Sequence, residues 1–277
     1  MGSRRDVLRW SVLGMPFLTA YIFLPAPVQG SEQFTYLGNL NEIPQQEAMG
    51  WTGTCVKGHH QSPINLDIPP HADQISPNSS KAAGPLVPRY PRFIKGGVTV
   101  ENTGHGSPQI NFPEQFSIQV NNQQFRLLQV HFHTPSEHTF NGKHFPAEAH
   151  LVHQNPETGE RIVVAVMIRT GLGNGVIQAA LDSAPTVPGA KADLAKAISL
   201  PTLLPGAVTG RRYATYSGSL TTPPCSEPIQ WYVLLDPVQA SPNEILELMS
   251  FNSGGTSYEL NSRPVQPLNG REVQYYL

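Results

Sequence analysis

A run of strand-like segments through the middle of the chain limits the folds that it can adopt. Six stretches rich in β-branched and aromatic residues follow one another between residues 93 and 235, separated by turn-forming residues. The chain has 24 glycines and 27 prolines among 277 residues, and only 14% of its residues are charged, against roughly 25% in ordinary soluble domains. This composition favours many turns, and it argues against a disordered chain or a basic nucleic-acid-binding protein.

The expected elements are short and mostly strands. The strands are predicted at residues 93–94 with 98–100, 116–120, 125–133, 148–153, 162–169 and 231–235. Two helices are predicted, one over Gly175–Ser183 and one over 245–251 after a capping box that begins at Ser241. Residues 69–91 are rich in Pro, Ser and Asn and predict an irregular surface loop. No repeat or linker divides the chain, so a single domain is expected after the N-terminal segment.

Residues 1–30 have the three-part pattern of an export signal. Arg4 and Arg5 precede a mostly apolar run of 15 residues, 10–24, which Pro16 interrupts and which is shorter than the roughly 20 residues needed to span a bilayer. The arginine pair resembles a twin-arginine signal, although a general secretory signal and an uncleaved anchor also remain open. We expect residues 31–277 to be a periplasmic or secreted domain with no stable membrane span.

The chain has two cysteines, Cys55 and Cys225, separated by 170 positions. In an oxidising compartment two lone cysteines usually pair, so export predicts a Cys55–Cys225 disulfide that stabilises the fold by roughly 2 to 5 kcal/mol. The alternative is two buried reduced thiols.

Six of the ten histidines fall within 23 positions, between residues 131 and 153. Since side chains alternate along a strand, Gln129, His131 and His133 share one face of their strand, and Glu148, His150 and Val152 share one face of the next. Three neutral imidazoles with no fourth protein ligand are typical of a catalytic zinc site with an open position. Gln129 and Glu148 are suited to accept the second ring N–H of a ligand histidine. The alternatives are unconnected structural histidines, or a site for cobalt or copper.

Several short motifs together resemble one known family. They are QSPI at 61–64, ENTGH at 101–105, HFH at 131–133, SEHT at 136–139, EAHLVH at 148–153, GSLTTPPC at 218–225 and NSRPVQ at 261–266. From Gln61 to the C-terminus, about four fifths of its length, the chain resembles the α-class carbonic anhydrases. The resemblance implies a mainly β (α+β) single domain over 31–277, with a large twisted, mostly antiparallel central sheet, a few short peripheral helices and a zinc cleft on the central strands.

The resemblance also implies a reaction: reversible hydration of CO2 to bicarbonate and a proton by zinc-bound hydroxide. His131, His133 and His150 correspond to the family's zinc ligands. Thr221 corresponds to a threonine that accepts a hydrogen bond from this hydroxide and donates its own proton to Glu137. The pocket positions that correspond to the family's CO2 site are Val152, Val163, Leu220, Thr222 and Trp231.

Four further residues receive roles from the resemblance. His105 corresponds to the family's proton shuttle, although the loop after it is one residue longer than usual and Thr103 replaces a frequent Asn. Tyr216 corresponds to a tyrosine that orders water near Thr221. Asn261 corresponds to a residue whose backbone helps to hold a ligand histidine, and His138 is interpreted as a buried structural histidine.

Two other functions remain open at this stage. One is a zinc-containing carbonic-anhydrase-like binding protein with little activity, and the other is hydrolysis of activated esters, expected only as a side activity. CO2 and bicarbonate are the expected small-molecule partners, and neither the oligomeric state nor the physiological direction of the reaction follows from the sequence.

Overall fold

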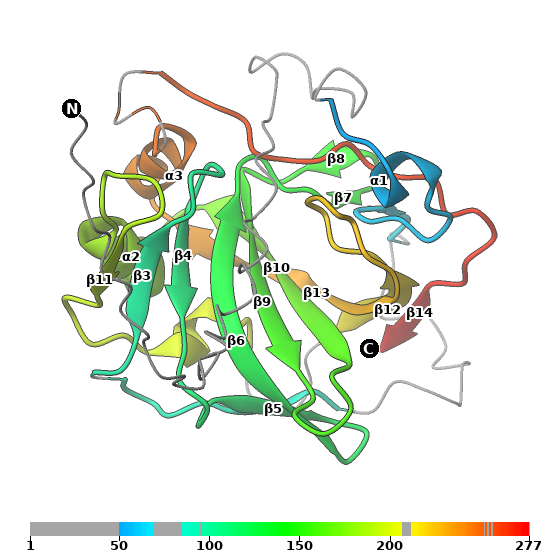
Figure 1. Ribbon diagram of the computed structural model, residues 1–277, viewed down its shortest axis with the longest axis horizontal. Coiled ribbons are helices and arrows are strands. Elements are labelled where there is room, and N and C mark those ends of the chain that lie inside the picture. Colours follow the sequence, from blue (N-terminus) through cyan, green and yellow to red (C-terminus); the bar gives the residue numbers. More distant parts are fainter. Residues whose placement is uncertain are drawn as a thin grey trace, which may run out of the picture. The chain divides into compact units, whose positions relative to one another are not determined.

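The computed structural model describes residues 50–68, 85–94, 96–206, 212–251, 253, 255 and 257–276, all of which belong to one compact unit (Figure 1). The predicted export signal and most of the predicted loop over 69–91 lie outside the described residues. Among the helices that are described, none is long and apolar enough to cross a membrane.

The described elements are short strands with a few helical turns between them. In chain order they are α1 (Thr54–Lys57), β1 (Asn65–Leu66), β2 (Val87–Arg89), β3 (Thr99–Asn102), β4 (Pro108–Asn111), β5 (Ser117–Val120), β6 (Gln123–His133), β7 (Thr139–Phe140), β8 (Lys143–His144), β9 (Ala147–Gln154), β10 (Arg161–Thr170), α2 (Gly175–Ser183), β11 (Lys191–Asp193), the 3₁₀ turn η2 (Leu200–Leu203), β12 (Tyr213–Gly218), β13 (Ile229–Ala240), α3 (Pro242–Met249) and β14 (Gln274–Tyr276).

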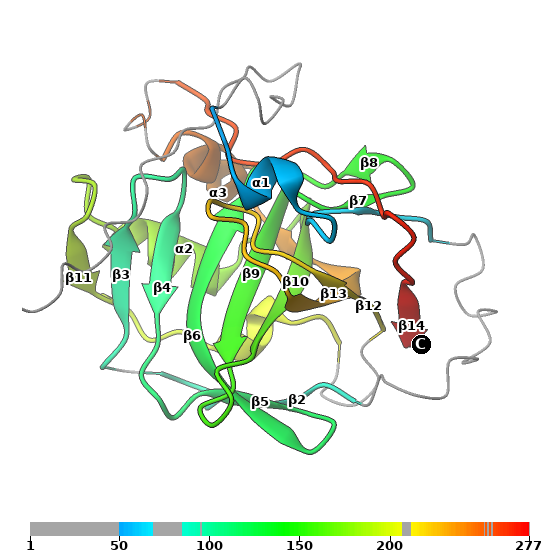
Figure 2. The ribbon, with the colours of Figure 1, turned by 45° about the vertical axis from the view of Figure 1, so that its right-hand side comes forward.

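Most of these strands form one large mixed sheet. Its order is β11-β3-β4-β6-β9-β10-β13-β12-β14, with β5 beside β6 and β2 beside β5, which makes 11 strands. Its ladders are antiparallel except for β10 with β13. Figures 1 and 2 show β6, β9 and β10 side by side in the middle of the sheet. This confirms the predicted mainly β fold with a mostly antiparallel central sheet.

Five of the six predicted strand regions are confirmed to within one residue, with Phe116 just outside β5, and the first is confirmed only in part. Residues 93–94 do not form a strand, because Ile94 makes a single antiparallel bridge with Ile198 before the strand β3 begins at Thr99. The prediction of an irregular loop over 69–91 is wrong at its end, where residues 87–89 form β2. This edge strand pairs with β5, and an edge position tolerates Pro88 because only one side of the strand is hydrogen-bonded.

The two faces of the sheet bury different sets of side chains. One apolar cluster contains Val130, Phe132, Ala149, Leu151 and Val164 together with residues of α2 and α3. The other contains Val152, Val163, Ala165, Trp231 and Val233. Side chains alternate along β6, so Gln129, His131 and His133 point to the second face. The predicted face that holds Gln129, His131 and His133 is therefore the face of Val152 and Trp231.

Both predicted helices are present and lie at the edge of the fold. The side chain of Asn174 accepts a hydrogen bond from the N–H of Val176 at the start of α2. Ser241 and Glu244 form the predicted capping box at the start of α3, which supplies partners for N–H groups that the helix itself leaves unpaired. α2 contacts both α3 and η2, and residues of all three belong to the first apolar cluster, on the face opposite the histidines.

Candidate active site

Three histidines from two neighbouring strands meet on the second face of the sheet. His131 and His133 lie on β6, and His150 lies on β9 directly opposite His131 in the ladder. The ring centroids are 5.0 Å apart for His131 and His133, 5.1 Å for His131 and His150, and 4.6 Å for His133 and His150. One ring nitrogen of each lies within 4.8 Å of the others, which is a spacing that one metal ion can bridge.

Each of these imidazoles uses one ring nitrogen in a hydrogen bond to the protein. Nδ1 of His131 lies 2.7 Å from Oε1 of Gln129, Nδ1 of His133 lies 2.7 Å from the carbonyl oxygen of Asn261, and Nε2 of His150 lies 2.8 Å from Oε1 of Glu148. The acceptors fix each tautomer, and Nε2 of His131, Nε2 of His133 and Nδ1 of His150 are left for a ligand. Nε2 of His133 is buried with no hydrogen-bond partner among the described residues, as expected of an atom that binds a metal.

The electrostatics favour the neutral form of the two histidines of β6. Burial, and then the neighbouring imidazoles, hold the pKa of His131 well below its usual value. Burial also lowers the pKa of His133, although Glu137 opposes the shift. A metal binds the unprotonated imidazole, so the pocket favours the ligating form before any metal enters.

Glu148 is the central acceptor beneath the histidine cluster. Its Oε1 lies 2.8 Å from Nε2 of His150 and 2.7 Å from Nδ1 of His138, and its Oε2 accepts the N–H groups of Glu137 and His138, both at 2.8 Å. Burial alone would raise the pKa of Glu148, but its attraction to His138 and His150 and its hydrogen bonds to them outweigh burial and keep the pKa well below the usual value. Because these atoms bind one another, His138, Glu148 and His150 form a hydrogen-bonded support and not a second metal site.

The hydroxyl of Tyr216 is hydrogen-bonded inside the protein. Its side chain is buried, and its hydroxyl lies 2.7 Å from Nε2 of His138 and donates to Oγ of Ser62 at 2.8 Å. Tyr216 lies outside the residues that line the cleft above the histidines. Tyr216 therefore helps to fix His138 from inside the protein, and its role in ordering water beside Thr221 stays a prediction.

A cleft of about 280 Å³ opens over the histidines, and it brings together all five predicted pocket positions. Thr221, Gln129 and two of the three histidines, His131 and His150, also line it. Two lining residues, Leu128 and Arg161, were not predicted. Its lining residues are Leu128, Gln129, His131, His150, Val152, Arg161, Val163, Leu220, Thr221, Thr222 and Trp231.

Glu137 lies beside the metal ligands and is fully buried. Its Oε1 is 3.5 Å from Nδ1 of His133, and its Oε2 is 3.9 Å from Nδ1 of His150. Oε1 accepts the backbone N–H of Arg263 at 2.9 Å, whereas Oε2 has no hydrogen-bond partner among the described residues. A buried carboxylate oxygen in this position needs a donor from the cleft side.

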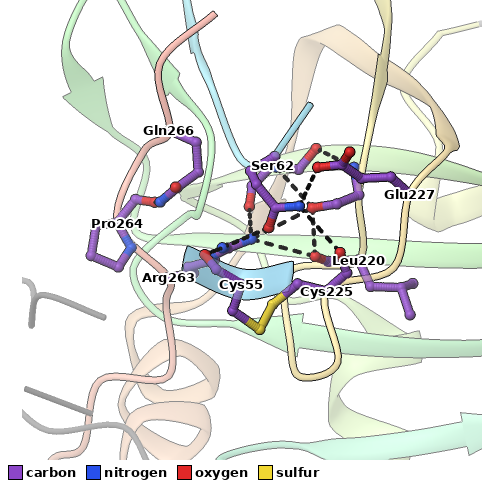
Figure 3. The surroundings of a disulfide bond; sticks show 10 residues. Cys55, Ser62, Leu220, Cys225, Glu227, Arg263, Pro264 and Gln266 are labelled. Atoms are coloured by element: carbon purple, nitrogen blue, oxygen red, sulfur yellow. Dashed lines mark hydrogen bonds between the residues drawn. A yellow bond between two sulfur atoms is a disulfide. The ribbon is translucent and has the colours of Figure 1, made fainter. Parts of the chain in front are cut away.

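Arg263 joins the segments that contain Cys55, Ser62 and Leu220 (Figure 3). Its fully buried guanidinium donates to the carbonyl oxygens of Ser62 and Cys55, both at 2.7 Å, and to that of Leu220 at 3.5 Å. Leu220 directly precedes Thr221, so the side chain of Arg263 braces the loop of Thr221. The backbone N–H of Arg263 at the same time holds Glu137. The sequence placed Arg263 in a family motif but assigned it no role.

The predicted disulfide is present. Cys55 and Cys225 are joined, and Figure 3 shows the bond beneath the hydrogen bonds of Arg263. Both half-cystines are buried with Trp51 in a small cluster of their own. The bond ties α1 to the loop that follows Thr221.

His105 lies half-buried in the turn between β3 and β4. Both flanking glycines have left-handed backbones, with φ of 77° at Gly104 and 93° at Gly106. A Cβ on Gly106 would lie 2.4 Å from Cβ of Asn261, so only glycine permits this close approach. His105 therefore sits in a turn packed directly against the residue that holds His133, although it is not itself among the lining residues of the cleft.

Asn261 supports the site through its side chain as well as its backbone. Besides accepting from His133, it takes the N–H of Thr134 on Oδ1 at 2.7 Å and donates from Nδ2 to the carbonyl of Phe132 at 2.9 Å. Asn261 thus brackets His133 on both sides along the chain. The sequence indicated the residue but not the side-chain clamp.

Three imidazoles on adjacent strands, each oriented by a hydrogen bond and lying below an open cleft, define a mononuclear metalloenzyme site of the zinc type. Comparison with known proteins identifies the class more closely. The profile of the eukaryotic-type carbonic anhydrases matches residues 45–277. A carbonic anhydrase of Pectobacterium atrosepticum is 36% identical over 219 residues, 79% of this chain and 81% of the relative. One from Nostoc is 32% identical over 274 residues, 98% and 96% of the two chains.

A solved structure gives the same result. Carbonic anhydrase Cah3 from Chlamydomonas reinhardtii superposes with a TM-score of 0.77 at 38% identity, covering 87% of this chain and 100% of the other. The chain belongs to the eukaryotic-type, or α, carbonic anhydrase family. Its activity is that of a carbonate dehydratase, with CO2 and bicarbonate as substrates, and its three-histidine cluster is the family's zinc site.

Proposed function

We propose that the residues around the three histidines divide this reaction among themselves, beginning with His131, His133 and His150 as the ligands that hold zinc. The observation that carries this assignment is the buried Nε2 of His133, which has no hydrogen-bond partner among the described residues. The imidazoles of His131 and His150 lie beside it, and each has one ring nitrogen that makes none of the supporting hydrogen bonds. The chemistry that zinc supplies in such a site is a water molecule whose pKa is about 7 and which is therefore a nucleophile at neutral pH.

Thr221 and Glu137 orient the attacking oxygen. The Thr221 hydroxyl can donate one hydrogen bond and accept another. Donation to the otherwise unpartnered Oε2 of Glu137 fixes the direction of the hydroxyl proton, so the Thr221 oxygen can act toward the reacting water only as an acceptor. This arrangement points a lone pair of that water toward the carbon of CO2.

Apolar side chains hold CO2 next to this nucleophile. Val152, Val163, Leu220 and Trp231 line the cleft beside His131 and His150. CO2 has no net charge and no hydrogen to donate, so an apolar wall binds it without the desolvation cost that a polar wall would impose. Nε1 of Trp231 donates to the carbonyl of Ser219 at 3.0 Å, so the indole presents its apolar surface with its polar group satisfied.

His105 carries the proton away from the site. An imidazole has a pKa near neutrality and can both receive and release a proton in the physiological range. The support for this role is the turn of His105, which is anchored against Asn261 and hence beside His133.

The decisive experiment follows CO2 hydration by stopped flow. Enzyme as prepared, enzyme after chelation, and chelated enzyme given one equivalent of zinc should be active, inactive and active again. A folded protein that binds one zinc but hydrates no CO2 would contradict the catalytic assignment and favour a binding protein. A folded His133→Ala variant should fail to take up zinc in the same preparation. Loss of zinc uptake without loss of the fold then shows that the site itself is lost.

We also propose that residues 1–30 export the chain and that residues 31–277 work in the periplasm or outside the cell. The disulfide between Cys55 and Cys225 and the bacterial relatives support an extracytoplasmic location. Fusion of residues 1–40 to a reporter, with Arg4 and Arg5 changed together to lysine in a second fusion, would test it. Export that depends on the arginine pair identifies the twin-arginine route, export of both fusions identifies the general route, and retention of both in the cytoplasm contradicts the proposal.

A further inference from the structure

Arg161 is a cation at the edge of the catalytic cleft that the reaction has not yet used. It is the first residue of β10 and is exposed to solvent. Side chains alternate along a strand, so Arg161 lies on the same face as Val163, which is itself a cleft residue. Both residues line the cleft together with His131, His150 and Thr221.

No described acidic side chain neutralises Arg161. Its guanidinium makes no hydrogen bond or ion pair to a described residue, although other described arginines do, such as Arg126 with Glu114 at 3.2 Å. Glu160 is adjacent in sequence, but its charge acts on Tyr232, a residue of the first apolar cluster on the opposite face, whose pKa is raised by burial and then by Glu160. The ladder neighbour of Arg161 across β9 is Gln154, which is uncharged.

Every other described residue that lines this cleft is uncharged when its histidines are neutral. The chain as a whole carries a formal charge of −2, so a free anion meets no general attraction to the protein. Arg161 is therefore the one charged side chain that the described part of the cleft presents to an entering anion.

We propose that Arg161 is an anion-binding residue that attracts monoanions, bicarbonate in particular, to the mouth of the cleft. This inference rests on the proposed function, because it takes bicarbonate as the anion that enters and leaves. Of the two carbon substrates, CO2 is neutral and bicarbonate is charged, so the positive charge acts on one of them only. A planar guanidinium also matches two oxygens of a carboxylate-like anion, which an ammonium group does less well.

The effect should therefore appear in anion affinity and not in the capture of CO2. Addition of CO2 to the site leaves the total charge near Arg161 unchanged, whereas binding of bicarbonate from solution adds one negative charge. The overall equilibrium constant fixes the ratio of kcat/KM in the two directions for every variant. Loss of the charge should thus raise the KM and kcat for bicarbonate together and raise the inhibition constant of other monoanions.

The test compares wild type with Arg161→Gln, Arg161→Lys and Arg169→Gln. Arg169 is the matched control, because it is an exposed arginine of the same strand but lies outside the cleft. Thiocyanate and bicarbonate are the probes. Their inhibition constants are measured by stopped-flow hydration, and their dissociation constants by the visible absorption of the cobalt-substituted enzyme, at about 10 mM and about 1 M ionic strength.

We expect Arg161→Gln to bind both anions about two- to fivefold more weakly at low salt, as one exposed charge screened by water would predict. Arg161→Lys and Arg169→Gln should stay within about twofold of wild type, and the difference should vanish at high salt. Equal affinity in wild type and Arg161→Gln would overturn the inference, as would an equal loss in Arg169→Gln. Because the cobalt spectrum reports binding without turnover, a site that binds anions but hydrates no CO2 would contradict the proposed function and leave this inference standing.

Discussion

At the scale of single residues, Thr221 is expected to act through the direction of its hydroxyl hydrogen bond and not through the shape of its side chain. The acceptor proposed for that hydroxyl is Oε2 of Glu137, a buried oxygen with no hydrogen-bond partner among the described residues. Thr221→Val keeps the shape of the side chain but removes the hydroxyl, and should lower kcat/KM for CO2 about a hundredfold, the effect typical of losing one oriented hydrogen bond at a reacting centre. Thr221→Ser should recover most of the activity. Equal activity of the valine and serine variants, measured by stopped flow, would contradict the orienting role.

His105 is expected to affect a different step. If it only carries protons, His105→Ala should lower kcat for hydration about a hundredfold, the scale of a lost acid–base group, and leave kcat/KM for CO2 nearly unchanged. Added imidazole buffer should restore kcat, because it supplies the missing carrier. An unchanged kcat, or a loss that imidazole does not relieve, would assign the proton to another path. The longer loop after His105 makes this comparison a direct test of the sequence resemblance.

The catalytic residues could be found from sequence mostly where a local rule governs them. Alternation along β6 and β9 predicted which side chains share a face, and the observed partners Gln129 and Glu148 follow from that rule. The contacts of Tyr216 were not predicted because its partners are distant: Ser62 is 154 positions away, and no local pattern encodes that contact. Arg161 was missed because an exposed charge at a strand end carries no signal until the fold shows what it faces.

At the scale of elements, the disulfide and Arg263 hold the same two segments together in different ways. The covalent bond joins Cys55 to Cys225, and the guanidinium of Arg263 bonds the carbonyl oxygens of Cys55 and Leu220. Local sequence could not predict this double connection, since Arg263 lies 208 positions from Cys55. The strand β2 shows the same limit, because it forms only through its pairing with β5.

Removing the disulfide should therefore affect stability more than catalysis. Cys55→Ala with Cys225→Ala should lower the free energy of unfolding by about 2 to 5 kcal/mol, because the unfolded chain is no longer closed into a long loop. At a temperature where the variant is folded, kcat/KM should stay within a few fold of wild type, since Arg263 still braces the loop of Thr221. Denaturant titration and CO2 hydration on the same sample check both parts. A large loss of kcat/KM in a fully folded variant would show that Arg263 alone does not hold the loop.

At the scale of the whole molecule, the sheet separates chemistry from support. Imidazoles of β6 and β9 bind metal on one face, while the face of Val130 and Leu151 packs against the helices. His153 belongs to β9 but is three residues beyond His150, so it points to the helix side and is fully buried there. Its Nε2 lies 2.5 Å from the hydroxyl of Tyr90. His150 and His153 of β9 thus point to opposite faces of the sheet.

Burial lowers the pKa of His153 to about 3 from an ordinary value of 6.5, which makes the fold sensitive to acid. Between these two values the unfolded chain binds a proton that the folded chain excludes, so the free energy of unfolding falls as the pH drops below about 6.5. The slope is about 1.4 kcal/mol per pH unit, or about 2 kcal/mol by pH 5. Above pH 6.5 both states are neutral and the residue adds no pH dependence.

His153→Gln removes this proton site while keeping a polar partner for Tyr90. Unfolding by denaturant, followed between pH 7.5 and pH 4.5 on chelated protein so that metal release adds no pH dependence, should show a flatter decline for the variant than for wild type. The exposed His144→Gln variant is the control and should follow wild type. Parallel curves for wild type and His153→Gln would mean that water or a local opening solvates His153, and the acid sensitivity would then have to arise from other buried groups of the sheet.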